Sequence, residues 1–313
     1  MEFTFTPLGV SAAQPAYGRH LAAHILSVGP ESFLLDCGEG TQFQFNSHGI
    51  KRNRIGHVFI SHLHGDHFFG LIGLLNSLGM NDRKEPLRVY APPGLEEIIE
   101  VQFRITQSGL PFPLHFQALD PSLVEKILET EHVEVHSFPL AHRAPTLGFL
   151  FREKQIPLNI IPDAIDRYGL TFEQIRAVKA GEELRLPDSQ IIPNTELTLP
   201  PYRPRSFAYC SDTAYKEDLV PLLKGVDLLY HESTFLEKDA EMAAITLHST
   251  AAQAARIAKL AGAGTLLLGH YSARYPDAGV FLEEAKPIFP NTLLSEEGKA
   301  VEIPLIRTTS PNP

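Results

Sequence analysis

The sequence has few cysteines, a shortage of basic residues and no long apolar run, and each shortage excludes a class of protein. Only two cysteines, Cys37 and Cys210, occur among 313 residues, and they form no spacing pattern. This predicts a reducing, cytoplasmic environment and argues against a disulfide framework. Acidic residues outnumber basic ones by 37 to 27, for a formal net charge of −10. That balance argues against nonspecific nucleic-acid binding by the whole surface but leaves a local basic patch open.

No apolar run approaches membrane-spanning length, so we expect no membrane association. The first six residues alternate like a strand and lack a basic region followed by an apolar one, so no signal peptide is expected. Hydrophobic residues make up 43% and charged residues 20%, which is typical of a soluble globular protein. The length suffices for one large domain or two small ones.

The stretch 61–67, Ser-His-Leu-His-Gly-Asp-His, is the strongest pattern in the chain. The apolar, β-branched run 57–60 before it is typical of a buried strand, and the apolar run 68–75 after it of a buried helix. The ligand-type residues therefore lie on a turn from strand to helix. There they can converge at the end of a sheet.

The spacing within this stretch indicates a metal site. His62 and His64 face the same side of an extended segment, and Gly65 lets the chain bend so that Asp66 and His67 approach from another direction. Four side chains from two directions suit two adjacent metal ions. Imidazole and carboxylate without thiolate suit zinc, manganese or iron in a catalytic site. A solvated polar loop is the alternative, and the spacing disfavours it.

Polar side chains also follow other predicted strands. Strands are predicted at 3–10, 24–28, 32–36, 87–91, 133–140, 206–210, 226–230 and 264–269, and helices at 95–104, 171–180 and 251–260. Residues able to hold a metal or carry a proton stand near the ends of several strands: Asp36, His142, Asp212, Glu232 and His270. Each has an ordinary explanation alone, and Asp36 fits an Asp-Gly turn as well as a role in orienting a histidine. Together they indicate one site, because crowded histidines and aspartates need partners.

The segment 152–205 differs in composition and apolar periodicity from the rest of the chain. Prolines recur in it, and only 171–180 has convincing helical periodicity. We expect an insertion or arm here, with mixed charges that fit either a grip on RNA or a contact in a dimer.

The order of these motifs resembles that of the metallo-β-lactamase fold superfamily and, within it, the ribonuclease Z family, whose members trim tRNA precursors at the 3′ end. The order is Asp36, His62-x-His64-x-Asp66-His67, His142, Asp212, His270. Four stretches carry the resemblance: 33–42, 59–71, the His-Glu-Ser-Thr of 231–234 and the His-Ser-Thr of 248–250. The similarity runs from residue 1 to about 304.

The resemblance implies an α/β fold, a four-layer αβ/βα sandwich formed as one domain over 1–313, with 152–205 as an arm that binds tRNA. It implies a homodimer and two zinc ions per subunit. The implied metal ligands are His62, His64 and His142 for one zinc, Asp66, His67 and His270 for the other, and Asp212 between them. The implied catalytic residues are Asp66, His248 and Glu232.

The implied activity is zinc-dependent cleavage of precursor tRNA by a metal-bound hydroxide, which leaves a 3′ hydroxyl on the tRNA and a 5′ phosphate on the trailer. One departure concerns the arm, where 169–175 lacks the Gly-Pro-rich motif common in the family and is not strongly basic. An alternative is a dinuclear hydrolase of the same fold that acts on small phosphodiesters or sulfate esters. A zinc-stabilised binding protein without turnover is disfavoured, because a structural site needs no proton donor.

Overall fold

The computed structural model describes residues 2–308, which form two compact units. The larger, here called the sandwich unit, contains residues 2–152 and 206–303, and the smaller, the arm unit, contains 153–205 and 304–308. No helix within the described range has both the length and the apolar character needed to span a bilayer.

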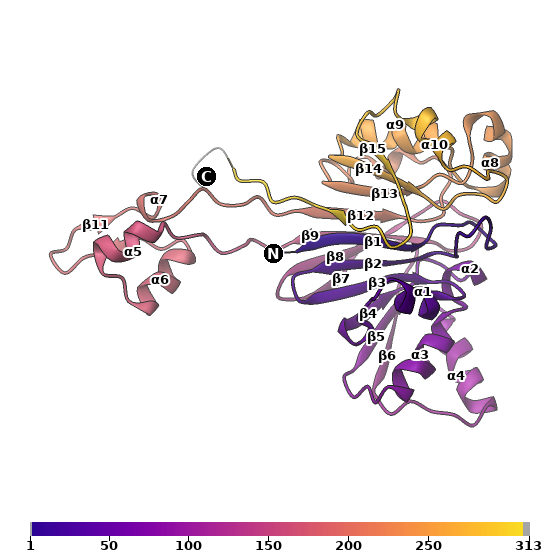
Figure 1. Ribbon diagram of the computed structural model, residues 1–313, viewed down its shortest axis with the longest axis horizontal. Helices are drawn as coiled ribbons and strands as arrows, with labels where there is room; N and C mark the ends of the chain where they lie inside the picture. The colour runs from indigo at the N-terminus through magenta and orange to yellow at the C-terminus, as the bar shows by residue number, and fades with distance from the viewer. Residues whose placement is uncertain (1, 309–313) are drawn as a thin grey trace. The chain divides into compact units, whose positions relative to one another are not determined.

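Two seven-stranded sheets form the centre of the sandwich unit (Figure 1). The first sheet has the order β16 (Val301–Glu302), β1 (Phe3–Gly9), β2 (Ala23–Val28), β3 (Glu31–Cys37), β4 (Ile55–Phe59), β5 (Leu87–Ala91) and β6 (Leu114–Ala118). The second has the order β15 (Thr292–Leu294), β14 (Thr265–Gly269), β13 (Leu228–Glu232), β12 (Ser206–Cys210), β9 (Leu147–Glu153), β8 (Val133–Pro139) and β7 (Glu125–Glu129). Strands β3 to β6 are parallel to one another, as are β12 to β15.

Helices cover the outer face of each sheet (Figure 1). The first sheet is covered by α1 (Thr41–Ser47), α2 (Gly65–Phe68), α3 (Leu71–Met80) and α4 (Leu95–Ile105), and the second by α8 (Ala240–Thr246), α9 (Ala251–Ala261) and α10 (Gly279–Ala285). Short 3₁₀ turns occupy Arg52–Arg54, Glu217–Leu219 and Glu237–Asp239. One core, rich in aromatic residues, lies between the sheets. A second core lies between the first sheet and its helices, and a third between the second sheet and its helices. The predicted four-layer αβ/βα sandwich is therefore confirmed.

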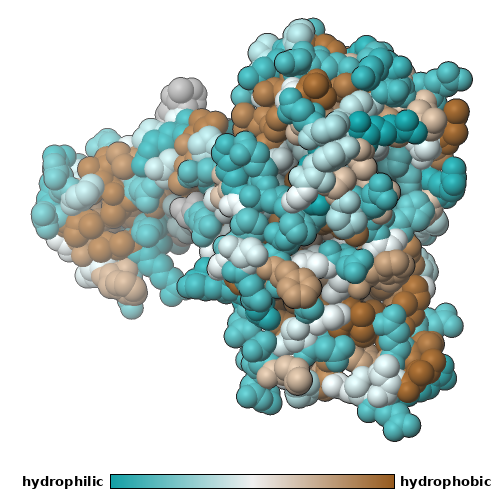
Figure 2. Space-filling model, turned by 45° about the vertical axis from the view of Figure 1, so that its right-hand side comes forward, coloured by the Kyte–Doolittle hydropathy of each residue, from teal (hydrophilic) through white to brown (hydrophobic). Residues whose placement is uncertain are grey.

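The arm unit has a small core of its own. It contains α5 (Pro162–Tyr168), α6 (Phe172–Lys179), a hairpin of β10 (Leu184–Arg185) and β11 (Ile191–Ile192), and α7 (Asn194–Leu197). At its two ends, the buried side chains of Glu153 and Arg205 form an ion pair with an N–O distance of 2.7 Å. Figure 2 shows apolar side chains gathered on one face of this unit. Phe172 and Ile191 are exposed large apolar residues of the unit.

Most predicted elements are confirmed, and two boundaries differ for identifiable reasons. The helix predicted over 68–75 is interrupted between α2 and α3, where the amide of Gly70 donates to the carbonyl of Cys37 (2.9 Å). The two segments of the chain approach so closely that a Cβ on Gly70 would lie 2.0 Å from the Gly38 carbonyl oxygen. Strand β13 extends to Glu232 because it pairs with β14 as far as Gly269, whereas the sequence predicts its end at residue 230.

Candidate metal centre

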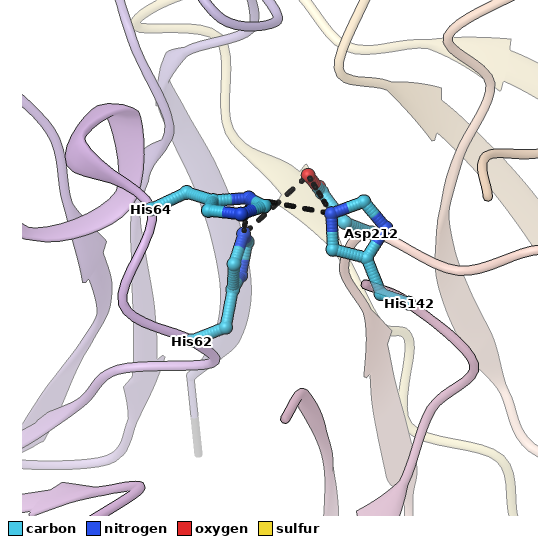
Figure 3. Close-up of side chains that lie close together, drawn as sticks. All are labelled: His62, His64, His142 and Asp212. Atoms are coloured by element: carbon cyan, nitrogen blue, oxygen red, sulfur yellow. Dashed lines mark hydrogen bonds and ion pairs between the residues drawn. The ribbon is translucent and has the colours of Figure 1, made fainter. Parts of the chain in front are cut away.

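Four side chains from three segments of the chain point toward one another (Figure 3). His62 and His64 follow β4, His142 lies three residues beyond β8, and Asp212 lies two residues beyond β12. His64 Nδ1 lies 3.0 Å from His62 Nε2 and 3.3 Å from His142 Nε2. Asp212 Oδ2 lies 3.6 Å from His62 Nε2 and 3.8 Å from His142 Nε2.

These separations match the edges of a coordination tetrahedron. With metal–ligand bonds of about 2.05 Å, the ligand atoms of a tetrahedral zinc lie about 3.3 Å apart. The four distances given above are 3.0 to 3.8 Å, and all four ligand atoms lie within 4.8 Å of one another. The group is therefore compatible with one bound metal ion.

A second group lies against the first and shares Asp212 with it. Asp212 Oδ1 lies 3.4 Å from His67 Nε2 and 3.3 Å from His270 Nε2. Asp66 Oδ2 lies 3.5 Å and 3.6 Å from the same two nitrogens. The Nε2 atoms of His67 and His270 are buried and have no hydrogen-bond partner among the described residues. Buried polar atoms normally have partners, and a cation between these four groups would supply one.

The other ring nitrogen of four histidines is held by a hydrogen bond that fixes which nitrogen carries the proton. Each Nδ1–H donates to an oxygen: His62 to Ser61 Oγ (3.0 Å), His67 to Asp36 Oδ2 (2.8 Å), His142 to the Leu247 carbonyl (2.9 Å) and His270 to Thr234 Oγ1 (2.9 Å). Each Nε2 lone pair is then left facing the cluster. Such outer hydrogen bonds are what metal-binding histidines usually show.

Electrostatics at the site favour a cation. Burial opposes ionisation of Asp212, but the neighbouring His270, His67 and His62 hold the pKa of its carboxyl well below the ordinary value. Burial likewise opposes protonation of His67, yet the surrounding carboxylates raise its pKa well above the ordinary value. Concentrated negative charge of this kind attracts a positive ion, whether a proton or a metal.

His248 and Glu232 form a hydrogen-bonded pair beside the two groups, and one ring nitrogen of His248 lies within 4.8 Å of ligand atoms of Asp212 and His270. His248 Nδ1–H donates to Glu232 Oε1 at 2.8 Å, and Glu232 is fully buried. The carboxylate also accepts from the amides of Thr213 and Thr234, both at 2.9 Å, and from Thr234 Oγ1 at 2.7 Å. Burial lowers the pKa of His248, but the Glu232 carboxylate outweighs it and raises that pKa to about 9. His248 is therefore a candidate proton donor.

An open cavity of about 290 Å³ gives access to the cluster. Its lining includes His64, Asp66, His142, Asp212, His248 and His270. A larger cavity of about 660 Å³ lies within the arm unit and contains none of these residues. The smaller cavity is the candidate active site because the titratable groups converge there.

All the residues predicted as metal ligands or proton carriers lie in this one neighbourhood. Asp36 contacts His67, as expected if it orients a metal-binding histidine. Sequence reasoning missed several groups that orient them, namely Ser61, Thr234, the Leu247 carbonyl and the Ala13 amide, which donates to Asp66 Oδ2 at 2.8 Å. Hydroxyl residues directly beside the motifs were the only signal for Ser61 and Thr234. The two backbone contacts left no signal in the sequence, since any residue can make them.

Comparison with family profiles gives two partial matches. Residues 3–108 match the profile described as Anti-Pycsar protein Apyc1, and residues 169–271 match the beta-lactamase superfamily domain. Among solved structures, human tRNase Z, short form, is similar over 96% of this chain and 99% of that chain, with 28% identity and a TM-score of 0.70. The metallo-beta-lactamase fold protein YhfI from Bacillus subtilis, at 19% identity and a TM-score of 0.68, supports the fold alone.

Curated relatives are similar over nearly their whole length. Ribonuclease Z of Parabacteroides distasonis is 43% identical over 303 residues, which cover 96% of this chain and 99% of that protein. Ribonuclease Z of Phocaeicola vulgatus is 41% identical over 300 residues, with coverages of 96% and 97%. With the fold and the His/Asp cluster described above, these likenesses confirm the predicted resemblance: the chain belongs to the ribonuclease Z family of endoribonucleases.

Proposed function

We propose that this enzyme is a zinc-dependent tRNA 3′-processing endoribonuclease that removes the 3′ trailer of precursor tRNA. The observation that carries the proposal is the pair of ligand groups sharing Asp212 beside the His248–Glu232 pair, in a chain of the ribonuclease Z family. The products are tRNA with a 3′ hydroxyl and a trailer with a 5′ phosphate.

Two zinc ions per subunit fit the residues of the site. His62, His64 and His142 would hold one ion, and Asp66, His67 and His270 the other, with Asp212 between them. Imidazole and carboxylate ligands without thiolate, and an open cavity beside them, are typical of catalytic zinc. When bound, such a pair of ions lowers the pKa of water and offsets negative charge on a phosphate.

Asp66 accepts a proton from the attacking water. Burial raises the pKa of its carboxyl, but the neighbouring imidazoles of His67 and His270 outweigh burial, lower that pKa below its ordinary value and keep the carboxylate ionised. The Ala13 amide, 2.8 Å from Oδ2, holds that oxygen in place at the cavity wall. An ionised, oriented carboxylate at this position suits a general base.

His248 donates a proton to the 3′ oxygen that leaves the scissile phosphorus. Its Nδ1–H is committed to Glu232, so Nε2 is the nitrogen available to the cavity. Glu232 keeps His248 protonated and fixes its ring. Two nearby zinc ions would lower the pKa of His248 from about 9 towards neutrality, where a general acid works best.

The arm unit, residues 153–205 of the predicted 152–205 insertion, binds the body of the tRNA. Its 660 Å³ cavity is lined by Phe172 together with Arg176 and Lys179, all on α6. An aromatic ring beside two cations suits a nucleic-acid chain, because bases stack on rings and phosphates pair with basic side chains. These residues would take the place of the missing Gly-Pro-rich motif.

The active form is a homodimer in the cytoplasm. Phe43 on α1 and Phe69, between α2 and α3, are 65% and 62% exposed, and Met80 at the end of α3 is 87% exposed. A hydrogen bond from Ser77 to Gln42 (2.7 Å) ties α3 to α1. Exposed apolar residues on neighbouring helices suit a subunit contact. Both cysteines are free and buried, as expected in a reducing compartment.

The test is cleavage of a 3′-extended tRNA transcript by the purified enzyme, with and without a zinc chelator. We expect one cut at the tRNA 3′ end, loss of cutting with chelator and recovery on adding zinc, with mass spectrometry giving the end groups. Mature tRNA without a trailer is the matched control. Turnover of bis-p-nitrophenyl phosphate without cleavage of the transcript would instead support a hydrolase of small phosphodiesters.

A further inference from the structure

The carboxylate of Asp36 is a fully buried junction of hydrogen bonds behind the metal centre. Its Oδ1 accepts from the Ser61 amide at 2.7 Å. Its Oδ2 accepts from three side chains: Ser61 Oγ at 2.9 Å, His67 Nδ1 at 2.8 Å and Tyr209 Oη at 2.7 Å. A buried carboxylate is tolerated only when such donors satisfy it. The Asp36 backbone also has a φ of 54°, in the left-handed region, which is kept only where the surroundings over-determine it.

Of these donors, Tyr209 comes from the opposite sheet. It lies on β12, whereas Asp36 lies on β3, so their hydrogen bond crosses the core between the two sheets. The side chain is 1% exposed, and its ring stacks on Tyr230 with a centroid separation of 4.9 Å and an angle of 27°. The His24 ring also packs against it, with a centroid separation of 5.4 Å and an angle of 59°. These contacts fix the ring, and the ring fixes the direction of its hydroxyl.

We propose that Tyr209 is a positioning residue whose hydroxyl fixes the Asp36 carboxylate and, through it, the imidazole of His67 in the second ligand group. This inference rests on the proposed metal-dependent function. Asp36 determines which nitrogen of His67 carries the proton and how the ring is turned. With the Tyr209 hydroxyl removed, one of three donors to Oδ2 is lost, and the carboxylate gains freedom to turn away from His67.

The effect is selective between the two ligand groups. Asp36 contacts His67 directly, but it reaches His62 of the first group only through Ser61, which accepts from His62 and donates to Asp36. Without the Tyr209 hydroxyl, Asp36 still accepts its two hydrogen bonds from Ser61. We therefore expect the second ligand group to weaken and the first to remain nearly unchanged.

The experiment is a zinc titration of the full chain against a chromophoric chelator, comparing wild type with Tyr209→Phe. The substitution keeps the stacked ring and removes only the hydroxyl. We expect two zinc ions per chain in both proteins, with one bound about 10-fold more weakly in the variant, the lower end of the range for losing a direct partner of a ligand, because Tyr209 acts on His67 through Asp36. Tyr230→Phe is the matched control, because Tyr230 is equally buried in the same stack while its hydroxyl lies against Gly269.

A double-mutant cycle with Asp36→Asn separates positioning from a general structural role. If Tyr209 acts through Asp36, the double variant binds the weaker zinc no less tightly than Asp36→Asn alone. Asp36→Asn also tests the link from the other side should Tyr209→Phe fail to fold. Thermal unfolding of the zinc-free proteins reports any loss of packing, which a purely structural role would show without a change in zinc affinity.

Three results would overturn the inference: wild-type affinity for both ions in Tyr209→Phe, an equal loss in Tyr230→Phe, or losses that add in the double variant. If wild type binds two zinc ions and Tyr209→Phe binds both with the same affinity, this inference alone is wrong. Wild-type protein that binds no zinc would overturn the proposed function and this inference with it.

Discussion

Replacing Glu232 by Gln should move the alkaline limit of activity to lower pH. The buried carboxylate accepts from His248 Nδ1–H at 2.8 Å and raises the pKa of His248 to about 9, from an ordinary 6.5. The amide of glutamine has nearly the same shape but no charge. Without that charge, burial is left as the main influence, and it lowers the pKa of His248 to 6.5 or below.

The sign and size follow from the protonated fraction of His248. A proton donor works while it is protonated, so activity falls as the pH rises through its pKa. At pH 8, a group with a pKa of 9 is about 90% protonated and one with a pKa of 6.5 about 3%, a deficit of about 30-fold. At pH 6 the deficit is less than about two-fold. Bound cations would lower both pKa values together and leave the direction of the difference unchanged.

The assay is the pH dependence of single-turnover cleavage of a 3′-extended tRNA, with zinc content measured in parallel. Glu241→Gln removes an exposed carboxylate on α8 and serves as the matched control, with an expected wild-type profile. His248→Ala should be slow at every pH and keep its zinc. His248 is not the proton donor if Glu232→Gln loses activity at the same alkaline pH as wild type, and it is a ligand if His248→Ala loses zinc.

Three further predictions concern the ligands, the arm and the fold. His64→Ala should lose one zinc by elemental analysis. Its activity should fall by more than the about 10- to 100-fold that is typical when a residue that only hydrogen-bonds a ligand is replaced; wild-type cleavage would refute the ligand assignment. Replacing Arg176 and Lys179 together by Ala should raise KM for precursor tRNA and reduce its salt dependence, while turnover of bis-p-nitrophenyl phosphate stays unchanged; equal losses on both substrates would exclude a tRNA contact. Thr250→Ala should lower the free energy of unfolding in urea by about 1 kcal/mol, because Thr250 and Gln253 form the capping box of α9, and Thr250→Ser should restore it.

The sequence predicts the sandwich well because its strands are short apolar runs closed by turns, and α9 because it begins at a capping residue. The arm is predicted poorly. Its hairpin strands β10 and β11 contain two residues each, and α5 has seven, so neither offers enough length for a periodic pattern. Their stability comes from a shared core that includes Leu184 and Ile192, which only the tertiary structure brings together.

The candidate ligands could be predicted because their residue types are chemically distinctive, whereas the residues that orient them could not. Tyr209 is an ordinary aromatic residue in a strand, and nothing in its local pattern points to Asp36, 173 positions earlier. Their contact depends on how the two sheets face each other. Serine and threonine beside the motifs likewise have many possible partners, and the choice among them is made by packing.

The candidate metal centre is divided between the two sheets, so the packing between them matters to the proposed chemistry. The segment after β4 supplies His62, His64, Asp66 and His67, while loops after strands of the second sheet supply His142, Asp212 and His270. Each ligand group combines residues from both sets, with Asp212 of the second set shared by the two groups. Neither set alone therefore provides a complete ligand group. Phe59, Phe149 and Tyr209 in the core between the sheets therefore set the distance across which the two sets meet. A change that shifts one sheet against the other should weaken both groups at once, unlike the loss of a single ligand.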